Sequence, residues 1–373
     1  MNPPTIHYLS DITFQAGALG ILPQLLHKLG ITKPLVVSDA GLVSLGMVER
    51  MGIGRPPVFD QVEANPTEAN AAAGREVFRE HGCDGIVAVG GGSPLDCAKC
   101  IGLLVHHPPP LSQYAFIHGG LSQITPRKPP LIAIPTTAGT GSEVGRAALV
   151  STSNGRKLAI ISPQVIPNAV ICDPTLTLGM PKALTAGTGM DAIAHCVETY
   201  CSPRFNPVAD AIALDGLARA CANIHEAVNH GENLAARSEM MMAALQGGLT
   251  FQKGLGLVHS LSHPLGGLQK RRLHHGTLNA IFLPHVLRFN WEACPEKMAR
   301  MAEAAGVASA SALPAFFASL AAELGLPGRL RDLGMAREDF ESMPEFAVQD
   351  HCSQTNPRGV TGEVCQQIYD EAF

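Results

Sequence analysis

"GIVAVGGGSPLDCAK", residues 85–99, joins a run of small and β-branched residues to three glycines and then to a helical pattern. The continuous apolar run predicts a strand buried on both faces, as in a parallel sheet. Ser93 suits a helix N-cap, Pro94 suits the first helical position, and Asp96 would complete a capping box. The stretch therefore predicts a β–turn–α unit whose glycines let an anionic ligand approach the start of the helix.

Three more runs of the same kind occur in the first half of the chain: "PLVVSDAG" (34–41), "LIAIPTT" (131–137) and "NAVICDP" (168–174). Segments with helical spacing, residues 66–81 and 94–106, lie between the earlier runs. This alternation predicts an α/β domain with a mostly parallel sheet. In such sheets ligands bind beyond the carboxyl ends of the strands.

The second half of the chain has a different character. Long Ala-, Leu- and Met-rich segments dominate and strand patterns nearly vanish, which predicts an all-α domain. The segment "LGMPK" (178–182) interrupts both patterns. We therefore expect an α/β domain over residues 1–180 and a helical domain over residues 181–373.

The composition excludes several classes of protein. A formal net charge of −5, with no basic run longer than "KRR" (270–272), argues against a nucleic-acid partner. The N-terminus lacks the regions of a signal peptide, and no stretch approaches the roughly 20 apolar residues of a membrane helix. The ten cysteines form no disulfide framework, which is typical of a reducing compartment. We expect a cytoplasmic protein without a membrane or nucleic-acid partner.

A second loop of small residues, "PTTAGTGSEVG" (135–145), follows another predicted strand and offers the hydroxyls of Thr136, Thr137 and Thr140. Two such loops at the same edge of one sheet predict a phosphate site. Asp39 ends the "VVSD" strand, where an acid can bind a ribose diol and repel a 2′-phosphate, which favours NAD over NADP. The alternative is that Asp39 only caps the following turn.

The helical half places metal ligands at helical spacing. Asp191 and His195 in "GMDAIAH" are four residues apart, as are His259 and His263 in "HSLSHPLGG", so each pair lies on one helix face. Either histidine of "HHG" (274–276) could add a further ligand. One carboxylate and several imidazoles suit Fe(II), Zn(II) or Mn(II). Each pair alone could instead be a hydrogen-bonded pair in a core, although an unpaired buried Asp191 would be costly.

With these motifs identified, the chain resembles the iron-containing (group III) alcohol dehydrogenase family over essentially its whole length. The resemblance is carried by "GGGSPLDCAK", "PTTAGTGSEV", "GMDAIAH", and "HSLSHPLGG" followed by "HHGTLNAIFLPHVLRFN". It implies a dinucleotide-binding α/β domain followed by a helical domain that binds metal and substrate. It also implies an NAD-linked alcohol dehydrogenase or aldehyde reductase. The enzyme would act on a small primary alcohol or aldehyde whose oxygen binds the metal, and would form a homodimer or larger homo-oligomer.

The resemblance also implies roles for individual residues. The metal ligands fall on Asp191, His195, His259 and His275, the last because "HG-x-x-N-A" follows it. His263 matches a histidine that lies close to the metal without binding it, and we interpret it as a catalytic candidate for orientation or proton relay. Four protein ligands and an open position favour Fe(II) over a closed tetrahedral Zn(II). The implied cofactor positions are Asp39, Asn65, Gly91, Gly92, Ser93, Thr136, Thr137, Thr140 and Lys157.

Residues 266–275 form a longer connection than is usual in the family, and they include Lys270, Arg271 and Arg272. These basic residues either attract an anionic substrate, such as a hydroxy acid, or form a solvated loop. Two alternative functions share the fold. A maleylacetate-type reductase works without the aspartate-and-histidine set, and a dehydroquinate synthase-like lyase needs more cationic side chains in its pocket.

Overall fold

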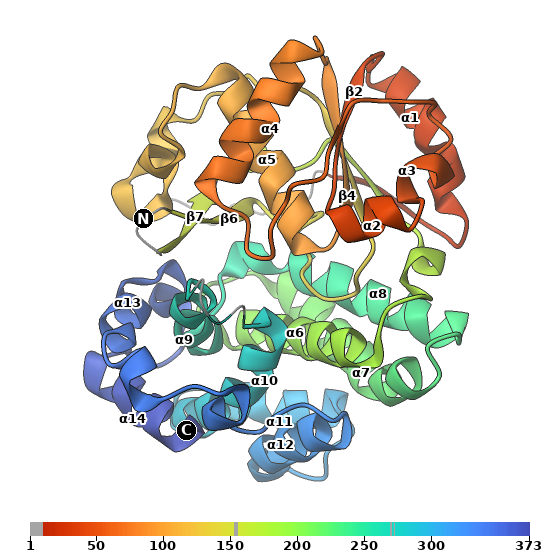
Figure 1. Cartoon of the computed structure of the whole chain (residues 1–373). Helices are drawn as coiled ribbons and strands as arrows, with labels where there is room; N and C mark the ends of the chain where they lie inside the picture. Colours follow the sequence, from red (N-terminus) through yellow and green to blue (C-terminus); the bar gives the residue numbers. More distant parts are fainter. Residues whose placement is uncertain (1–9, 153–155, 269–270, 272) are drawn as a thin grey trace. The chain divides into compact units, whose positions relative to one another are not determined.

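A parallel sheet of six strands organises the first part of the chain, in the spatial order β1-β8-β5-β4-β2-β3 (Figure 1). The structure is a computed structural model that describes residues 10–152, 156–268, 271 and 273–373. Its parallel sheet confirms the predicted α/β class. The six strands are β1 (Asp11–Phe14), β2 (Pro34–Val37), β3 (Val58–Phe59), β4 (Gly85–Gly90), β5 (Leu131–Pro135) and β8 (Ala169–Cys172).

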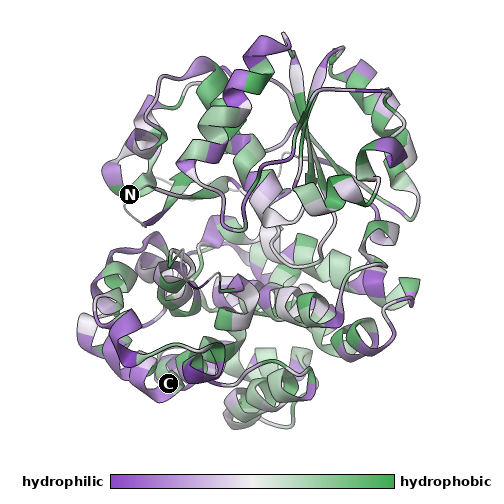
Figure 2. Cartoon of the chain, viewed as in Figure 1, coloured by the Kyte–Doolittle hydropathy of each residue, from purple (hydrophilic) through white to green (hydrophobic). Residues whose placement is uncertain are grey.

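Successive side chains of the central strands face opposite layers of helices. In β4, Ile86 and Ala88 pack into a core with α4 and α5, whereas Val87 and Val89 pack into a core with α1 and α3. These helices accordingly lie on opposite sides of the sheet, whose four inner strands are buried along their length (Figures 1 and 2). The helices of this part are α1 (Leu22–Lys28), α2 (Ala40–Ser44), α3 (Met47–Arg50), α4 (Glu68–Glu80) and α5 (Gly92–His106).

Four strands were not predicted from the sequence. Strands β1 and β3 are short edge strands of the sheet, and β6 (Ala147–Ser151) and β7 (Lys157–Ile161) form a separate antiparallel pair. Short edge strands carry little periodic signal, since a run of two to four residues fits many patterns. The four apolar runs from which strands were predicted all form strands, namely β2, β4, β5 and β8. They were recognisable because buried parallel strands are apolar on both faces.

The remainder of the described chain is helical and contains no strand from residue 178 onward. The Ala- and Leu-rich segment from Pro295 to Leu324 forms two helices, α11 and α12, because the chain turns at Gly306, which has a φ of +69°. The helices are α6 (Lys182–Cys201), α7 (Pro207–Asn229), α8 (Leu234–Leu249), α9 (Leu257–Gly266), α10 (His275–Asn290), α11 (Pro295–Ala304), α12 (Leu313–Glu323), α13 (Met343–Gln349) and α14 (Gly362–Ala372).

The chain forms two compact units. The α/β unit contains the described residues up to Thr137, together with Ser142–Thr177. The helical unit contains Leu178–Phe373 and also the short segment Ala138–Gly141. None of the described helices is both long enough and apolar enough to cross a membrane.

Helix α6 forms the centre of the helical unit. All its residues from Thr185 to Cys201 are buried, and α7, α8 and α10 pack around it. The first turn of α10 approaches the α6 backbone directly. A Cβ atom on Gly276 would lie 2.0 Å from the carbonyl oxygen of Gly187 and 3.1 Å from Cβ of Asp191. Glycine at position 276 therefore sets the distance between α10 and α6.

We predict that Gly276→Ala destabilises the protein by about 1–3 kcal/mol, because the new methyl group overlaps backbone atoms that cannot rotate away. Urea unfolding of the purified protein would measure the loss. Gly362→Ala in α14 is the matched control, since its Cβ would meet nothing within 4 Å. The control should change stability by less than about 1 kcal/mol, toward stabilisation. Equal stabilities for the two variants would contradict the close packing described here.

Candidate functional site

Four predicted ligands converge inside the helical unit. Asp191 and His195 lie one turn apart on α6, His259 lies on α9, and His275 is the first residue of α10. The Nε2 atoms of the three histidines lie 3.5, 3.6 and 3.7 Å from one atom, Oδ1 of Asp191. These distances are too long for hydrogen bonds. They are close to the separation of roughly 3.0–3.4 Å between two donors that bind one cation at about 2.1 Å.

Hydrogen bonds on the far side of two of these rings fix their tautomers. Nδ1 of His259 lies 2.5 Å from Glu198 Oε2, and Nδ1 of His195 lies 3.2 Å from the carbonyl oxygen of Gly139. A carboxylate and a carbonyl accept hydrogen bonds, so each Nδ1 donates its proton outward. In the neutral form of each ring, Nε2 therefore directs a lone pair toward Asp191, which is the arrangement found for metal-binding histidines.

The protonation states in this cluster are set by burial and by close charges. Burial would raise the pKa of Asp191, but the close imidazoles of His195, His275 and His259 hold that pKa well below its usual range. Burial lowers the pKa of His195 to about 4, against the effect of Asp191. Burial would also lower the pKa of His259, but the carboxylates of Asp191 and Glu198 raise it to about 9, so a cation must displace a proton from this ring to bind it. An ionised carboxylate and a neutral His195 are the forms that ligate a cation.

Sequence reasoning missed two residues of this cluster. Glu198 holds His259 and also accepts a hydrogen bond from the backbone N–H of Val258, at 2.6 Å. It follows Asp191 by seven residues and therefore lies on the same face of α6. Asn279 follows His275 by four residues on α10. Helical spacing, applied one turn further along each helix, would have indicated both residues.

The Asn279 amide provides an independent test of whether a cation fits this site. Its Nδ2 lies 2.7 Å from Asp191 Oδ1, 3.1 Å from His259 Nε2 and 3.2 Å from His275 Nε2. Its Oδ1 is buried and, among the described residues, has no hydrogen-bond partner. A half-turn of the amide would direct this oxygen, a potential ligand, toward the same point. The donor set and the orphaned oxygen both fit a divalent cation.

The two histidines of "HHG" have different environments. His274 is the N-cap of α10, and its Nδ1 accepts a hydrogen bond from the backbone N–H of Thr277 at 3.3 Å. His275 follows it and faces Asp191. The geometry therefore favours His275 as the fourth ligand, as the resemblance implied.

His263 lies beside the ligand set without facing Asp191. Its ring centroid is 5.7 Å from that of His259 and 5.4 Å from that of His275, with which it stacks. Its Nδ1 lies 2.9 Å from Asp350 Oδ2, so the carboxylate orients the imidazole. This position is compatible with the predicted role near the metal, and that role stays a prediction.

The predicted cofactor residues of the α/β unit cluster at the carboxyl ends of its strands. A Cβ atom on Gly91, after β4, would lie 3.3 Å from the side chain of Thr137, after β5, so the two small-residue loops lie side by side. The backbone N–H of Asn65 donates to Ser93 Oγ at 3.2 Å, and Lys157 Nζ donates to Asn65 Oδ1 at 2.9 Å. These contacts join three residues that are far apart in the sequence.

The predicted capping of α5 was wrong. The helix begins at Gly92, with Gly91 at the N-cap and no side-chain cap, because the glycines allow the helix to start before Ser93. Asp96 instead accepts hydrogen bonds from Ser142 Oγ at 2.5 Å and from the backbone N–H of Leu149 at 3.0 Å. The first N–H groups of α5 therefore receive no bond from a capping side chain, which suits an anion.

Three other predicted positions have particular surroundings. Asp39 is the N-cap of α2 and accepts a hydrogen bond from the backbone N–H of Leu42 at 3.0 Å, so it does cap the turn. Thr136 lies at the end of β5, and its backbone N–H donates to Gly90. Thr140 lies in the segment that belongs to the helical unit. Their predicted roles with the dinucleotide stay predictions.

Of the three consecutive basic residues, Lys270 and Arg272 lie outside the described residues. Arg271 is bound to the protein itself: its guanidinium lies 2.6 Å from the carbonyl oxygen of Gly334 and 2.6 Å from Asp339 Oδ2. This pairing favours a structural role for Arg271 over recruitment of an anionic substrate.

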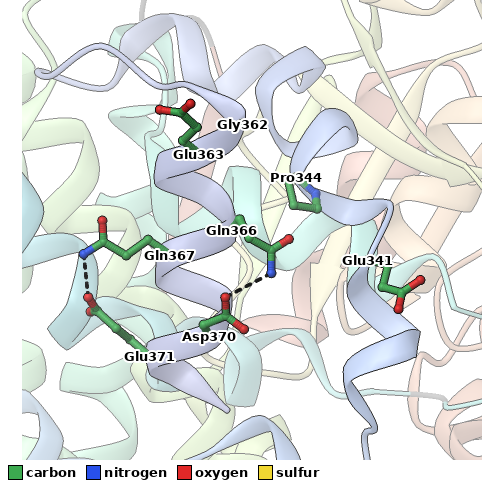
Figure 3. Close-up of a pocket in the computed structure, with 8 residues that line it drawn as sticks. All are labelled: Glu341, Pro344, Gly362, Glu363, Gln366, Gln367, Asp370 and Glu371. Atoms are coloured by element: carbon green, nitrogen blue, oxygen red, sulfur yellow. Dashed lines mark hydrogen bonds between the residues drawn. The ribbon is translucent and has the colours of Figure 1, made fainter.

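A hollow between α13 and α14 is not a second candidate for the reaction site (Figure 3). Its walls carry exposed acids and amides, and these pair along α14, Gln366 with Asp370 and Gln367 with Glu371. Among the residues that the structure describes, no histidine or cysteine lines it. The hollow is a solvated surface feature.

Comparison with known proteins identifies the family of the chain. Residues 10–174 match the family model described as iron-containing alcohol dehydrogenase, and residues 185–373 match the C-terminal model of the same family. The chain therefore belongs to the iron-containing alcohol dehydrogenase family. It is an oxidoreductase of the alcohol dehydrogenase type.

Relatives of known activity and structure cover the whole chain. The chain is 46% identical to 4-hydroxybutyrate dehydrogenase of Cupriavidus necator over 380 residues, which is 99% of each protein. It is 39% identical to a crystal structure of 1,3-propanediol oxidoreductase, with a TM-score of 0.91 over 99% of this chain and 100% of that one. A sulfoacetaldehyde reductase from Bifidobacterium kashiwanohense, solved with NAD+, is 25% identical with a TM-score of 0.89, over 99% and 98% of the two chains.

We predict that Glu198→Gln weakens metal binding by about 10–100-fold, because Gln cannot accept the His259 proton with a full charge. Competition with a chromophoric chelator would measure the affinity. Glu296→Gln, at an exposed position of α11, is the control and should bind metal like the unaltered protein. An unchanged affinity in Glu198→Gln would show that this carboxylate does not support the ligand set.

Proposed function

We propose that this protein is a metal-dependent, NAD(H)-linked alcohol dehydrogenase or aldehyde reductase that acts on a small primary alcohol or aldehyde. The observation that carries the proposal is the convergence of three imidazole Nε2 atoms on Asp191 Oδ1 at 3.5–3.7 Å. A divalent cation held by these residues supplies a Lewis acid that polarises the substrate oxygen and lowers the pKa of an alcohol.

The protein's own residues prepare the site in three ways. Asp191 contributes the negative charge that a buried cation needs, and burial keeps His195 neutral and able to ligate. Glu198 and the Gly139 carbonyl hold two rings in the required tautomer. The ligand atoms therefore need little reorganisation when a cation binds. Four protein ligands with an open position for substrate favour Fe(II), with Zn(II) as the second choice.

The α/β unit would hold the dinucleotide. The N–H groups at the start of α5, where the structure shows no capping side chain, suit a pyrophosphate, and the adjacent hydroxyl of Thr137 suits its oxygens. The amide of Asn65, held by Lys157, adds a further polar group at this edge of the sheet. The nicotinamide supplies the hydride chemistry when bound, and the protein supplies its position.

His263 is proposed to orient the substrate or move its proton. Asp350 accepts the Nδ1 proton of His263 and so orients its ring. The 46% identity to 4-hydroxybutyrate dehydrogenase supports a small hydroxy acid or diol among the substrates. We place the metal-independent reductase and the lyase below this proposal, since neither accounts for the complete ligand set.

We predict that Asp191→Asn loses both bound metal and measurable turnover, because the amide cannot supply the charge that offsets a buried dication. Elemental analysis after anaerobic purification, run beside NADH oxidation with small aldehydes, would measure both. Chelator treatment of the unaltered protein should abolish activity, and Fe(II) should restore it. Asp370→Asn, at an exposed position of α14, is the control. Full turnover in metal-free Asp191→Asn would end the proposal.

We predict that Asp39→Asn narrows the preference for NAD over NADP by on the order of tenfold, or about 1.4 kcal/mol. Asparagine retains the N-cap of α2 but removes the charge that repels a 2′-phosphate. Initial rates with the two cofactors would give the ratio, and thermal unfolding would verify that the cap is kept. An unchanged ratio at unchanged stability would leave Asp39 with its capping role alone.

A further inference from the structure

A second group of ligand-bearing side chains lies next to the Asp191 centre. It consists of His263 from α9 and three consecutive residues, Asp350, His351 and Cys352, at the start of the 3-10 helix η12 (His351–Thr355). One ligand atom from each residue can be chosen so that all four lie within 4.8 Å of one another. We call this group the thiol cluster.

We propose that the thiol cluster is a second cation site, which binds a thiophilic divalent cation such as Zn(II) or Co(II). Asp350 Oδ2 lies 2.9 Å from His263 Nδ1, and Asp350 Oδ1 lies 3.4 Å from His351 Nδ1. Cys352 Sγ lies 3.4 Å from His351 Nε2. Two donors bound to one zinc ion at about 2.0–2.3 Å are separated by roughly 3.3–3.8 Å. The two short distances to His351 involve different ring nitrogens, and only one of them can bind a given cation. A turn of the His351 ring or of the Cys352 side chain would therefore complete this geometry, starting from ligand atoms that already lie within 4.8 Å of one another.

The local backbone holds three of the four residues in place. Asp350 is the N-cap of η12, and its Oδ1 accepts a hydrogen bond from the backbone N–H of Cys352 at 2.9 Å. His263 is fixed by its position on α9, and its ring stacks on that of His351 with centroids 5.9 Å apart. The site is therefore assembled from a capped turn and one rigid helix.

The donor set distinguishes the two sites. The Asp191 centre offers one oxygen and three nitrogens, whereas the thiol cluster offers one oxygen, two nitrogens and one sulfur. Sulfur favours zinc, cobalt and other thiophilic cations. Cys352 is fully buried, and burial raises the pKa of its thiol well above the ordinary value, so the thiol is protonated until a cation displaces the proton. His351 is half-buried and gives a cation access from solvent.

Helix α9 connects the two sites. His259 and His263 are four residues apart on one face of α9, with ring centroids separated by 5.7 Å, and each serves a different site. Two dications this close repel one another, and only the thiol cluster must release a thiol proton when a cation binds, so the thiol cluster should fill after the Asp191 centre. A cation there would immobilise His263. If the proposed function is correct, on which this consequence rests, excess thiophilic cation should therefore inhibit the enzyme.

The competing interpretation is a cluster held by hydrogen bonds alone, since Asp350 already bonds to His263 and to the Cys352 backbone. Titration of the full chain with Co(II), with chelator removed, separates the two interpretations. Thiolate bound to Co(II) gives a charge-transfer band in the near ultraviolet. The Asp191 centre has no sulfur ligand, so this band reports the thiol cluster alone.

We expect the band to develop as a second equivalent of Co(II) binds. Cys352→Ser should lose the band and bind a single equivalent, and His351→Ala should weaken the second binding step. Cys365→Ser, which removes a buried thiol of α14 outside the cluster, is the matched control and should keep the band. Thermal unfolding of each variant would verify folding. A missing band in the unaltered protein, or a band that persists in Cys352→Ser, would overturn the proposal.

The two proposals can fail separately. Asp191→Asn should lose the first equivalent of Co(II) and keep the charge-transfer band, because its thiol cluster is intact. A band in a protein that shows no alcohol dehydrogenase activity would support the second site and reject the proposed function. Alcohol dehydrogenase activity with one equivalent of metal and no charge-transfer band would support the proposed function and reject the second site.

Discussion

The burial of the Asp191 carboxylate inside α6 is the constraint on which the helical unit depends. An isolated carboxylate in an apolar helix is costly, and the surrounding structure offsets that cost by directing three imidazoles at one of its oxygens. This arrangement requires α9 and α10 to approach α6 closely. Glycine at 276 allows the approach, because any larger residue would overlap the backbone at Gly187.

Two of the three histidines of the centre are held by a hydrogen bond on the side that faces away from Asp191. Glu198 fixes His259, the Gly139 carbonyl fixes His195, and Asn279 contacts three of the four ligands. Such support matters because a ligand set that is already oriented loses less conformational entropy when a cation binds. The same principle extends to Asp350 and His263, where a capped turn orients the neighbouring imidazole.

The two units carry different parts of the proposed chemistry. Small residues dominate the loops after β4 and β5, since a dinucleotide must approach the backbone and the start of α5. Charged and imidazole side chains dominate the centre on α6, α9 and α10, since a cation needs ligands. Both the small residues of the loops and the ligand side chains of the helices can be recognised in the local sequence, because glycine loops and helical spacing are properties of short segments.

The sequence by itself determined the α/β class, the four central strands, and the paired ligands Asp191 with His195 and His259 with His263, because strand patterns and the 3.6-residue repeat of a helix are local. It left open whether His274 or His275 faces the centre, and although helical spacing places Glu198 and Asn279 on the ligand-bearing faces of their helices, it does not show what they contact. Only the tertiary structure decided those points. The direction of α10 depends on its packing against α6, and Asp350 meets His263 across 87 residues of chain. Such long-range contacts have no local pattern from which they could be inferred.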